Sequence, residues 1–230
     1  MVTTLLLLVA IVAILVAAYL FVWKKPRRAR ASPSPNGRAR GPEPDQDLSS
    51  LKPGDVVALW SGKEALVERV VACRETLPGR VTRWDWVFLE GGQLLAATPA
   101  GNVLYADTVV LHQGTAPFEQ LTGEVERGGV LKTFEARVRE GTIGSDPVFF
   151  EHEGQRYRVQ STGTFAVPDQ PVPEAQVWSD VQADEGQNVY FKLIGSDGTQ
   201  VLGIWTSHIA LLFGRALAAA DVREIYRSGR

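Results

Sequence analysis

Residues 189–206 read VYFKLIGSDGTQVLGIWT, and this stretch decides the fold class. Two runs rich in aromatic and β-branched residues flank Ser196-Asp197-Gly198. An Asp-Gly pair between such runs is typical of the tight turn of a β-hairpin. Glycine-containing turns recur along the chain from Leu51 onward. The sequence therefore predicts a mainly β domain built from hairpins.

Four hairpins are predicted by this pattern. Each joins two short β-type runs across a turn that contains glycine. The predicted strand pairs are Val56–Trp60 with Ala65–Cys73, Trp84–Leu89 with Gln93–Thr98, Val148–Glu151 with Arg156–Ser161, and Val189–Ile194 with Thr199–Thr206.

Two further segments have a clear periodicity. Val130–Arg139 alternates between apolar and charged residues, which predicts a strand with one buried face. Ala216–Arg227 places Leu217, Ala220, Ile225 and Tyr226 on one side, which predicts a short C-terminal helix.

The order of the hairpins repeats along the chain. Residues 51–125 and 130–227 each open with a hairpin, continue through a tryptophan segment and close with a longer hairpin. Either half alone has too few apolar residues for a good core. We therefore expect two similar β halves, β-roll or barrel-like, packed together with the short C-terminal helix. The alternative is that the similarity is coincidental, as is common in all-β chains with regular turns.

The N-terminus has the pattern of a membrane anchor. Residues 1–23 contain no charged side chain. From Thr3 to Trp23, a helix would span about 32 Å, enough for a hydrocarbon core of about 30 Å. Basic residues follow directly, which predicts one transmembrane helix with its C-terminal side in the cytoplasm. The alternative is a cleaved signal peptide, which Ala17-Ala18 would permit.

Residues 24–47 form the predicted linker between this helix and a domain over residues 48–230. The linker contains five prolines and no large apolar side chain, so we expect it to stay disordered. Its first basic residues are candidate contacts to anionic lipid, at about 1 kcal/mol each. The alternative is a topology signal followed by a plain tether. The candidate lipid contacts are Lys24, Lys25, Arg27, Arg28 and Arg30.

Charge and cysteine content exclude several classes of function. The net charge is −2, but from Leu48 onward 17 basic residues face 23 acidic ones. This acidic body argues against nucleic-acid binding, which needs a basic face. Cys73 is the single cysteine, so a disulfide framework and a cysteine-built zinc site are excluded. Cys73 ends an apolar run and is predicted to be a buried, inert thiol.

No pattern of catalytic residues stands out. The three histidines, His112, His152 and His208, lie on different predicted strands or turns. Gly62-Lys63 lacks the hydroxyl residue of a phosphate-binding loop, and the acids around Asp180 lack the glycine of a calcium loop. The sequence therefore predicts no catalytic residue, no cofactor and no metal ligand.

Trp84 and Trp86 are the strongest candidates for a binding role. They lie on one face of a predicted strand, with Asp85 on the other. Such aromatic residues usually fill a β-core. If their face is exposed, they would instead form a binding patch of residue types common at interface hot spots.

Three motifs occur in an order that resembles a known family. They are Leu51-Lys52-Pro53-Gly54-Asp55-Val56-Val57, then Val67-Glu68-Arg69-Val70, then Trp84-Asp85-Trp86-Val87-Phe88-Leu89 before a glycine turn. Over about residues 51–226 the chain resembles the bacterial domain of unknown function family 4178. The resemblance implies a β-rich module without an established catalytic activity or active-site residues. It also implies a link to bacterial membrane-stress systems of the phage-shock type.

These observations favour a single-pass, membrane-tethered binding or scaffolding module. We expect it in the cell membrane, with the N-terminus outside and the domain in the cytoplasm. Its expected partners are the lipid bilayer and another protein, and not nucleic acid. The alternative is a hydrolase-like or ligand-processing enzyme whose site is assembled from scattered carboxylates and histidines. An extracytoplasmic domain would require the opposite topology.

Overall fold

The computed structural model describes residues 45–229, apart from residues 78–79, 99–100, 168–177 and 182–187. The chain divides into two compact units, Met1–Glu43 and Pro44–Arg230, and only the second is described. The predicted transmembrane helix and the candidate lipid contacts lie outside the described residues. Among the residues that are described, no helix is both long and apolar enough to cross a membrane.

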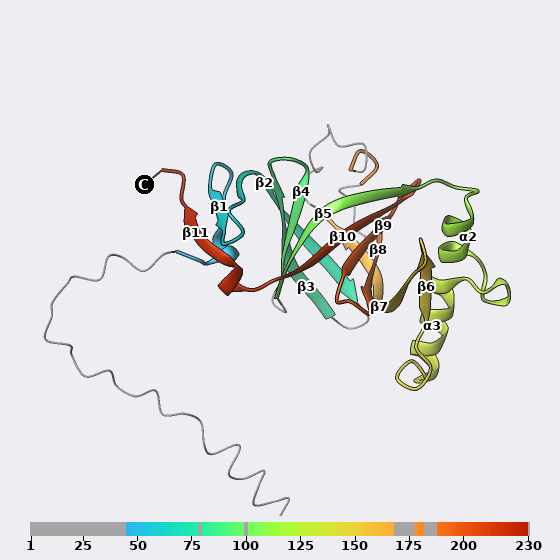
Figure 1. The fold of residues 1–230 in the computed structure, drawn as a ribbon. Coiled ribbons are helices and arrows are strands. Elements are labelled where there is room, and N and C mark those ends of the chain that lie inside the picture. The colour runs from blue at the N-terminus through green and yellow to red at the C-terminus, as the bar shows by residue number, and fades with distance from the viewer. Residues whose placement is uncertain (1–44, 78–79, 99–100, 168–177, 182–187, 230) are drawn as a thin grey trace, which may run out of the picture. The chain divides into compact units, whose positions relative to one another are not determined.

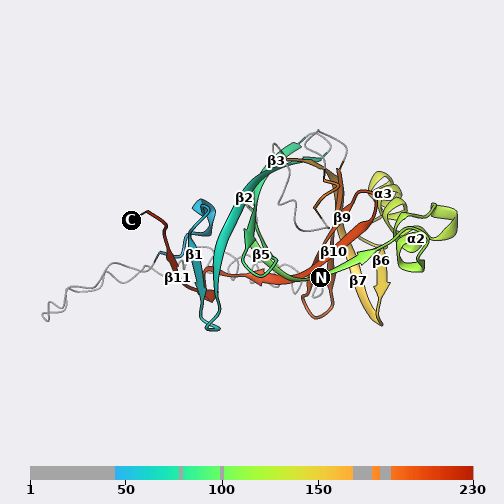
Figure 2. The ribbon, with the colours of Figure 1, turned by 90° about the horizontal axis from the view of Figure 1, so that it is seen from above.

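One antiparallel sheet organises the described part of the chain (Figure 1). Eight of its strands close into a ring, in the order β2-β3-β4-β5-β10-β9-β8-β7, with β7 pairing back to β2 (Figure 2). In ring order, their bounds are β2 (Glu64–Leu77), β3 (Arg80–Leu89), β4 (Gln93–Thr98), β5 (Gly101–Leu111), β10 (Ile209–Leu217), β9 (Gln200–Trp205), β8 (Asn188–Gly195) and β7 (Gln155–Ala166).

Three strands lie outside the ring. β6 (Phe149–His152) pairs with β7, β1 (Val56–Leu59) pairs with β2, and β11 (Val222–Tyr226) pairs with β1. We call β1, β11 and residues 64–66 of β2 the arm. β2 is long enough, at 14 residues, to serve both the arm and the ring.

The prediction of a mainly β fold is confirmed, as are the four predicted hairpins, β1–β2, β3–β4, β6–β7 and β8–β9. At the last turn, the Asp197 carboxylate accepts a hydrogen bond from the backbone N–H of Thr199 at 2.9 Å, and Gly198 adopts φ 87°. Asp-Gly is preferred at such a turn because glycine adopts positive φ without steric strain.

The expected barrel-like form is observed as a closed ring, but the two halves are not separate β units packed together, because the described strands form one continuous sheet. Each segment contributes four consecutive strands to the ring, β2-β3-β4-β5 and β10-β9-β8-β7, and the two arcs join edge to edge where β5 pairs with β10 and β2 with β7. Closing the ring satisfies backbone groups that two separate half-sheets would leave exposed at their edges.

Val130–Arg139, predicted as a strand, is instead helix α3 (Val130–Glu140). Its buried residues are Val130, Leu131 and Phe134, a helical spacing, whereas Val138 is exposed. The alternation over three apolar positions was a weak signal in a segment rich in good helix formers. Gly141, at φ 72°, ends the helix.

The predicted C-terminal helix is also wrong. Residues 216–217 end β10, a short 3₁₀ turn follows at Ala219–Asp221, and β11 completes the segment. The Asp221 carboxylate accepts a hydrogen bond from the Ala218 backbone N–H at 2.8 Å. Alanine favours a helix locally, but pairing with β1 buries Val222 and Ile225, and this tertiary contact overrides local propensity.

The ring separates three apolar clusters. Its interior is filled mainly by aromatic side chains, including Trp84, Trp86, Phe165, Trp178 and Tyr190. On the outside, helices α2 (Ala116–Thr122) and α3 cover one part of the sheet. The arm covers another part, over the outward-facing residues of β3, β4 and β5. Most strands are therefore buried on both faces.

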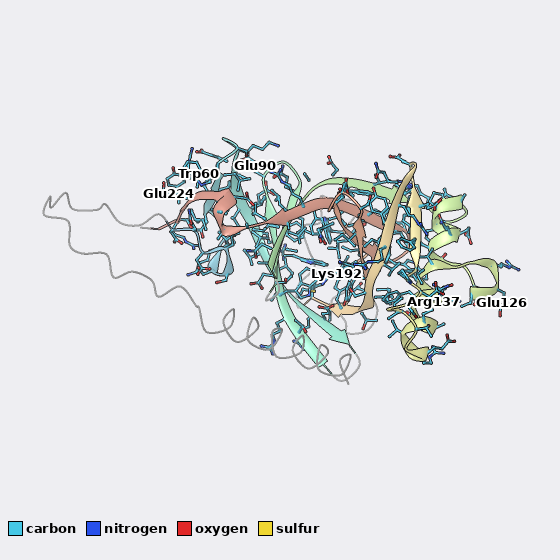
Figure 3. All side chains as sticks on the ribbon, turned by 60° about the horizontal axis from the view of Figure 1, so that its bottom comes forward. Trp60, Glu90, Glu126, Arg137, Lys192 and Glu224 are labelled. Carbon is cyan, nitrogen blue, oxygen red and sulfur yellow. The ribbon has the colours of Figure 1, made fainter. Side chains whose placement is uncertain are left out.

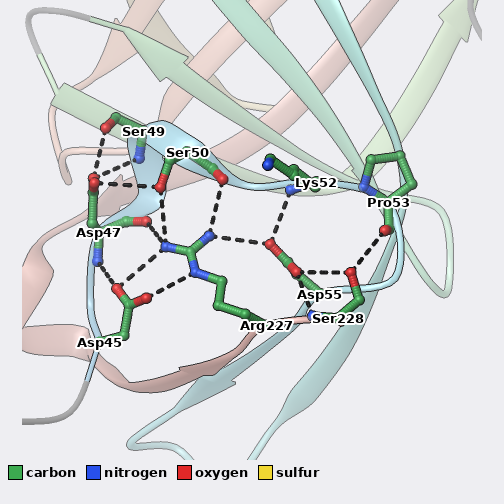
Figure 4. A network of polar contacts seen from close by, with 9 residues as sticks. All are labelled: Asp45, Asp47, Ser49, Ser50, Lys52, Pro53, Asp55, Arg227 and Ser228. Atoms are coloured by element: carbon green, nitrogen blue, oxygen red, sulfur yellow. Dashed lines mark hydrogen bonds and ion pairs between the residues drawn. The ribbon is translucent and has the colours of Figure 1, made fainter. Parts of the chain in front are cut away.

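Arg227 joins the two ends of the described domain (Figure 4). Its guanidinium donates hydrogen bonds to the carboxylates of Asp45, at 2.8 Å, and Asp55, at 3.1 Å. Asp45 and Asp47 belong to the predicted linker, yet both bond to Arg227, and Asp45 also accepts a hydrogen bond from Ile225 of β11. The residues that precede the first strand are thus bound to the arm.

Candidate functional site

Both candidate tryptophans lie inside the ring. Trp84 is 4% exposed and Trp86 is 0% exposed, and their rings lie 5.4 Å apart in an edge-to-face arrangement. Trp86 also contacts Phe165 and Trp178, at 5.0 and 4.9 Å between ring centres. They share one face, as predicted from the strand pattern, but that face is not the exposed one that a surface patch requires.

Trp84 differs from Trp86 because it borders a pocket at one end of the ring interior. We call this pocket, of about 260 Å³, the ring mouth. It lies where β4, β5, β9 and β10 begin or end, and its walls combine apolar and polar side chains. The polar and aromatic residues that line it are Trp84, Thr98, Asn102, Tyr105, Lys192 and Gln200.

Lys192 brings a charge to the ring mouth from β8. Its ammonium lies 3.9 Å from the carboxylate of Glu75, a buried residue of β2. The same ammonium lies 5.3 Å from the ring centres of Trp84 and Tyr190, within the range of a cation–π contact. A carboxylate and two aromatic rings therefore surround one ammonium group.

Sequence reasoning missed this pair. One signal for it is that Lys192 is the single charged residue in the otherwise apolar run 189–194 of β8. Such strands are typical of a sheet that is covered on both sides. Glu75 had no comparable signal, since it follows Arg74 in a strand with several charged residues.

Three donors in the ring interior lack a hydrogen-bond partner within the described residues. They are Nε1 of Trp84, Nε1 of Trp86 and the hydroxyl of Tyr190. Buried polar groups are usually paired, so unpaired ones in one region are notable.

Cys73 is fully buried in the same interior, as predicted. Burial, and secondly the negative charge of Glu75, raise the pKa of its thiol well above the ordinary value. The reactive thiolate is therefore disfavoured, and Cys73 contributes packing rather than a nucleophile.

The histidines lie in separate places. His112 follows β5, His152 ends β6 and stacks near Phe150 and Phe213, and His208 lies between β9 and β10. Within the described part of the chain, no group of three histidine, cysteine or acidic residues is arranged to hold a metal ion.

His208 joins a serine and an aspartate, which makes it the place to look for hydrolase chemistry. The Ser207 hydroxyl donates to the Asp180 carboxylate, and this bond is the main cause of the lowered pKa of Asp180. Nδ1 of His208 lies 3.2 Å from the Ser207 hydroxyl and 3.4 Å from Asp180. A catalytic triad bonds serine and aspartate to opposite ring nitrogens, whereas here both approach the same one.

A second surface lies on the outer face of the arm. Trp60 is 67% exposed, Tyr226 45% and Leu66 39%. Val56 pairs with both Tyr226 and Leu66 across the strands, so these three form one row, and Trp60 lies beyond the end of β1. Among the described residues, five large apolar side chains are exposed, and three of them lie here.

A charged row crosses this arm face between the Val56 row and Trp60. Ala58 pairs with Glu64 on one side and Glu224 on the other, and Arg223 forms an ion pair with Glu64. Figure 3 shows Trp60 and Glu224 at one end of the domain, Arg137 and Glu126 at the other, and Lys192 between them.

Comparison with known proteins finds no matching family model, curated protein or solved structure. The class that the structure itself defines is an eight-stranded antiparallel ring with an appended arm and two covering helices. Within the described residues, the ring mouth and the arm face both combine apolar side chains with charged ones.

Proposed function

We propose that this chain is a membrane-tethered, non-catalytic module that binds another protein through the outer face of its arm. The observation that carries the proposal is the cluster of Trp60, Leu66 and Tyr226 on that face. Exposed aromatic and aliphatic side chains gathered on one surface are typical of protein interfaces, where tryptophan and tyrosine contribute most of the binding energy.

The chemistry of the partner surface follows from charge. The body of the domain is acidic, and Glu64 and Glu224 cross the arm face between Trp60 and the row of Tyr226 and Leu66. Complementary charge steers partners together and rejects wrong ones. The partner should therefore present lysine or arginine between two groups of apolar side chains.

The N-terminal segment supplies the proposed tether. Residues 1–23 carry no charge and five basic residues follow by Arg30, the pattern of a single membrane span with the domain in the cytoplasm. Asp45, the first described residue, bonds to β11 in the arm. The proposed tether thus joins the domain beside the proposed interface, which favours a partner that is itself at the membrane.

The order of sequence motifs supports membership of family 4178 and, through it, a role in bacterial membrane-stress systems. The family membership and the membrane-stress role are both parts of this proposal. The enzyme alternative rests on Asp180, Ser207 and His208, and their geometry does not activate the serine. A binding module accounts for the exposed arm face, which a hydrolase would not require.

Site-specific photocrosslinking in native membranes tests the proposal. A photoreactive phenylalanine analogue is placed in the full chain at position 60 or 226, and at Val138 as the control. Val138 is equally exposed and apolar but lies on α3, away from the arm. We expect one shared crosslinked protein from the two arm positions and not from position 138. The same product from all three positions, or none from the arm, would contradict the proposal.

A further inference from the structure

We propose that the ring mouth is a second binding site, for a small neutral molecule that carries a carbonyl or hydroxyl acceptor. It is independent of the arm face, from which it differs in position and in chemistry. The pocket of about 260 Å³ lies inside the ring, whereas the rest of that interior is filled by side chains.

Placing Lys192 and Glu75 in the ring interior removes their charges from water, which costs desolvation free energy. An apolar pair of similar size would often serve stability as well as a buried ion pair. The side chain of Glu75 is buried, whereas that of Lys192 is 30% exposed and lines the pocket. Their separation of 3.9 Å is longer than a hydrogen bond. The pair is thus not closed by a hydrogen bond, which leaves the ammonium of Lys192 open to a further partner and points to a role in binding.

Lys192 has donors to offer a ligand. Within the described residues its ammonium makes one ion pair and two ring contacts, and no hydrogen bond is formed. An ammonium carries three N–H donors, so a ligand acceptor in the pocket would find them available. The side-chain amides of Asn102 and Gln200 add donors and acceptors to the same wall.

Charge balance selects a neutral ligand. An anion would draw Lys192 away from Glu75 and leave a buried carboxylate uncompensated, which is strongly unfavourable. A cation would compete with an ammonium that the chain already holds in place between Glu75, Trp84 and Tyr190. A neutral acceptor can bond to Lys192 while the pair stays intact.

The size and walls of the pocket narrow the class further. Its volume is below the roughly 300–1,000 Å³ of most ligand pockets, so the ligand is about one ring with a single polar substituent. Ala96, Val103 and Ala216 provide apolar walls opposite the polar ones. The hydroxyl of Thr98 already donates to the Gly101 carbonyl at 2.6 Å, so it offers an acceptor only.

Three probes of one shape and different charge test the inference: benzamide, benzoate and benzylammonium. Each is titrated into the full chain in detergent while the indole N–H signals are followed by NMR. Trp84 borders the pocket and Trp60 on the arm is the internal control. We expect benzamide to shift the Trp84 signal saturably, at least tenfold more tightly than either charged probe, with Trp60 unchanged. Equal or tighter binding of a charged probe, or no shift from any probe, would overturn the proposal.

Variants of the pair sharpen the test by changing the charge preference. Lys192→Met leaves the Glu75 carboxylate unpaired, so benzylammonium should gain at least tenfold in affinity while benzamide loses. Glu75→Gln leaves the Lys192 ammonium unpaired, so benzoate should gain at least tenfold in affinity. If a single variant fails to fold, the neutral double variant Glu75→Gln/Lys192→Met should bind benzamide at least tenfold more weakly, because the donor is gone. Lys132→Met, on the exposed face of α3, is the matched control and should bind all three probes as the unaltered chain does.

A preference that does not move with these substitutions would contradict the assignment to Lys192 and Glu75. Crosslinking from position 60 should be unaffected in every variant, so the result is read separately from the proposed function.

Discussion

The guanidinium of Arg227 lies 3.1 Å from the carboxylate of Asp55, although 172 residues separate them in the chain. Asp55 also accepts hydrogen bonds from the backbone N–H groups of Lys52, at 3.0 Å, and Ser228, at 2.8 Å. Burial opposes ionisation of this carboxyl, but these bonds and Arg227 outweigh it and lower its pKa below the ordinary 3.8. The pair therefore holds the start of β1 against the end of β11.

Replacing Asp55 should destabilise the domain in a pH-dependent way. Asp55→Asn removes a hydrogen-bonded charge, and we expect a loss of about 2 kcal/mol in the free energy of unfolding at pH 7. Because the folded-state pKa is lowered, this stability is present above pH 4 and is lost as the pH falls through the folded value. Urea unfolding between pH 7 and pH 3 measures it. The exposed Asp107→Asn is the control and should be neutral. An Asp55→Asn domain that loses as much stability on acidification as the unaltered one would refute this role.

The start of the folded unit should matter for stability. A fragment of residues 44–230 keeps the bonds from Arg227 to Asp45 and Asp47, whereas a fragment that begins at Leu48 loses them. We expect both fragments to fold, with the shorter one less stable by about 1–3 kcal/mol, since bonds between charged groups are worth about that much each. Circular dichroism should show mainly β structure, and thermal melting gives the difference. Equal melting temperatures would mean that these bonds contribute nothing.

Trp86 should be essential to the core. It is fully buried among Trp84, Phe165 and Trp178, and Trp86→Ala should destabilise by about 3–5 kcal/mol. Trp84→Phe keeps an aromatic ring beside the ring mouth and should cost about 1 kcal/mol. Urea unfolding of the two variants compares them. Similar losses in the free energy of unfolding for Trp86→Ala and Trp84→Phe would contradict this difference between the two positions.

The arm face should tolerate polar substitution in the isolated domain. Trp60 is largely exposed, so Trp60→Ser should change the free energy of unfolding by no more than about 0.5 kcal/mol. In native membranes, however, it should abolish crosslinking from position 226. Val138→Ser on α3 is the control and should change neither the free energy of unfolding nor the crosslinking from position 226. A large loss of stability in Trp60→Ser would show that Trp60 packs in the fold, and it would contradict its role as an exposed binding residue.

The predicted topology can be measured with fusions at Arg230. A reporter active only in the cytoplasm should be active there, and one active only outside should not. Neutral residues in place of Lys24, Lys25, Arg27, Arg28 and Arg30 should give mixed orientation, because the positive charge sets it. Activity of the outside reporter in the unaltered protein would reverse the assignment.

Local chemistry made the hairpins predictable. The bonds from Asp197 to Thr199 and the positive φ of Gly198 lie within three residues of one another. The shared face of Trp84 and Trp86 follows equally from the two-residue period of a strand. In residues 130–139 the short alternating pattern predicts a strand, but the segment is a helix. In residues 216–227 the local pattern predicts a helix, but pairing with the distant strand β1 decides the structure.

The sequence by itself determined the β class, the hairpin turns and the charge pattern of the N-terminal segment, because each depends on residues that are neighbours in the chain. Only the tertiary structure decided that the strands close into one ring, that Glu75 meets Lys192, and that Trp60 and Tyr226 share an exposed arm. The ring and the Glu75–Lys192 pair join distant segments, because ring closure buries both faces of most strands while pairing their edges. Trp60 and Tyr226 share the arm because β11 pairs with β1 outside the ring. No local pattern in the sequence predicts pairing between such distant segments.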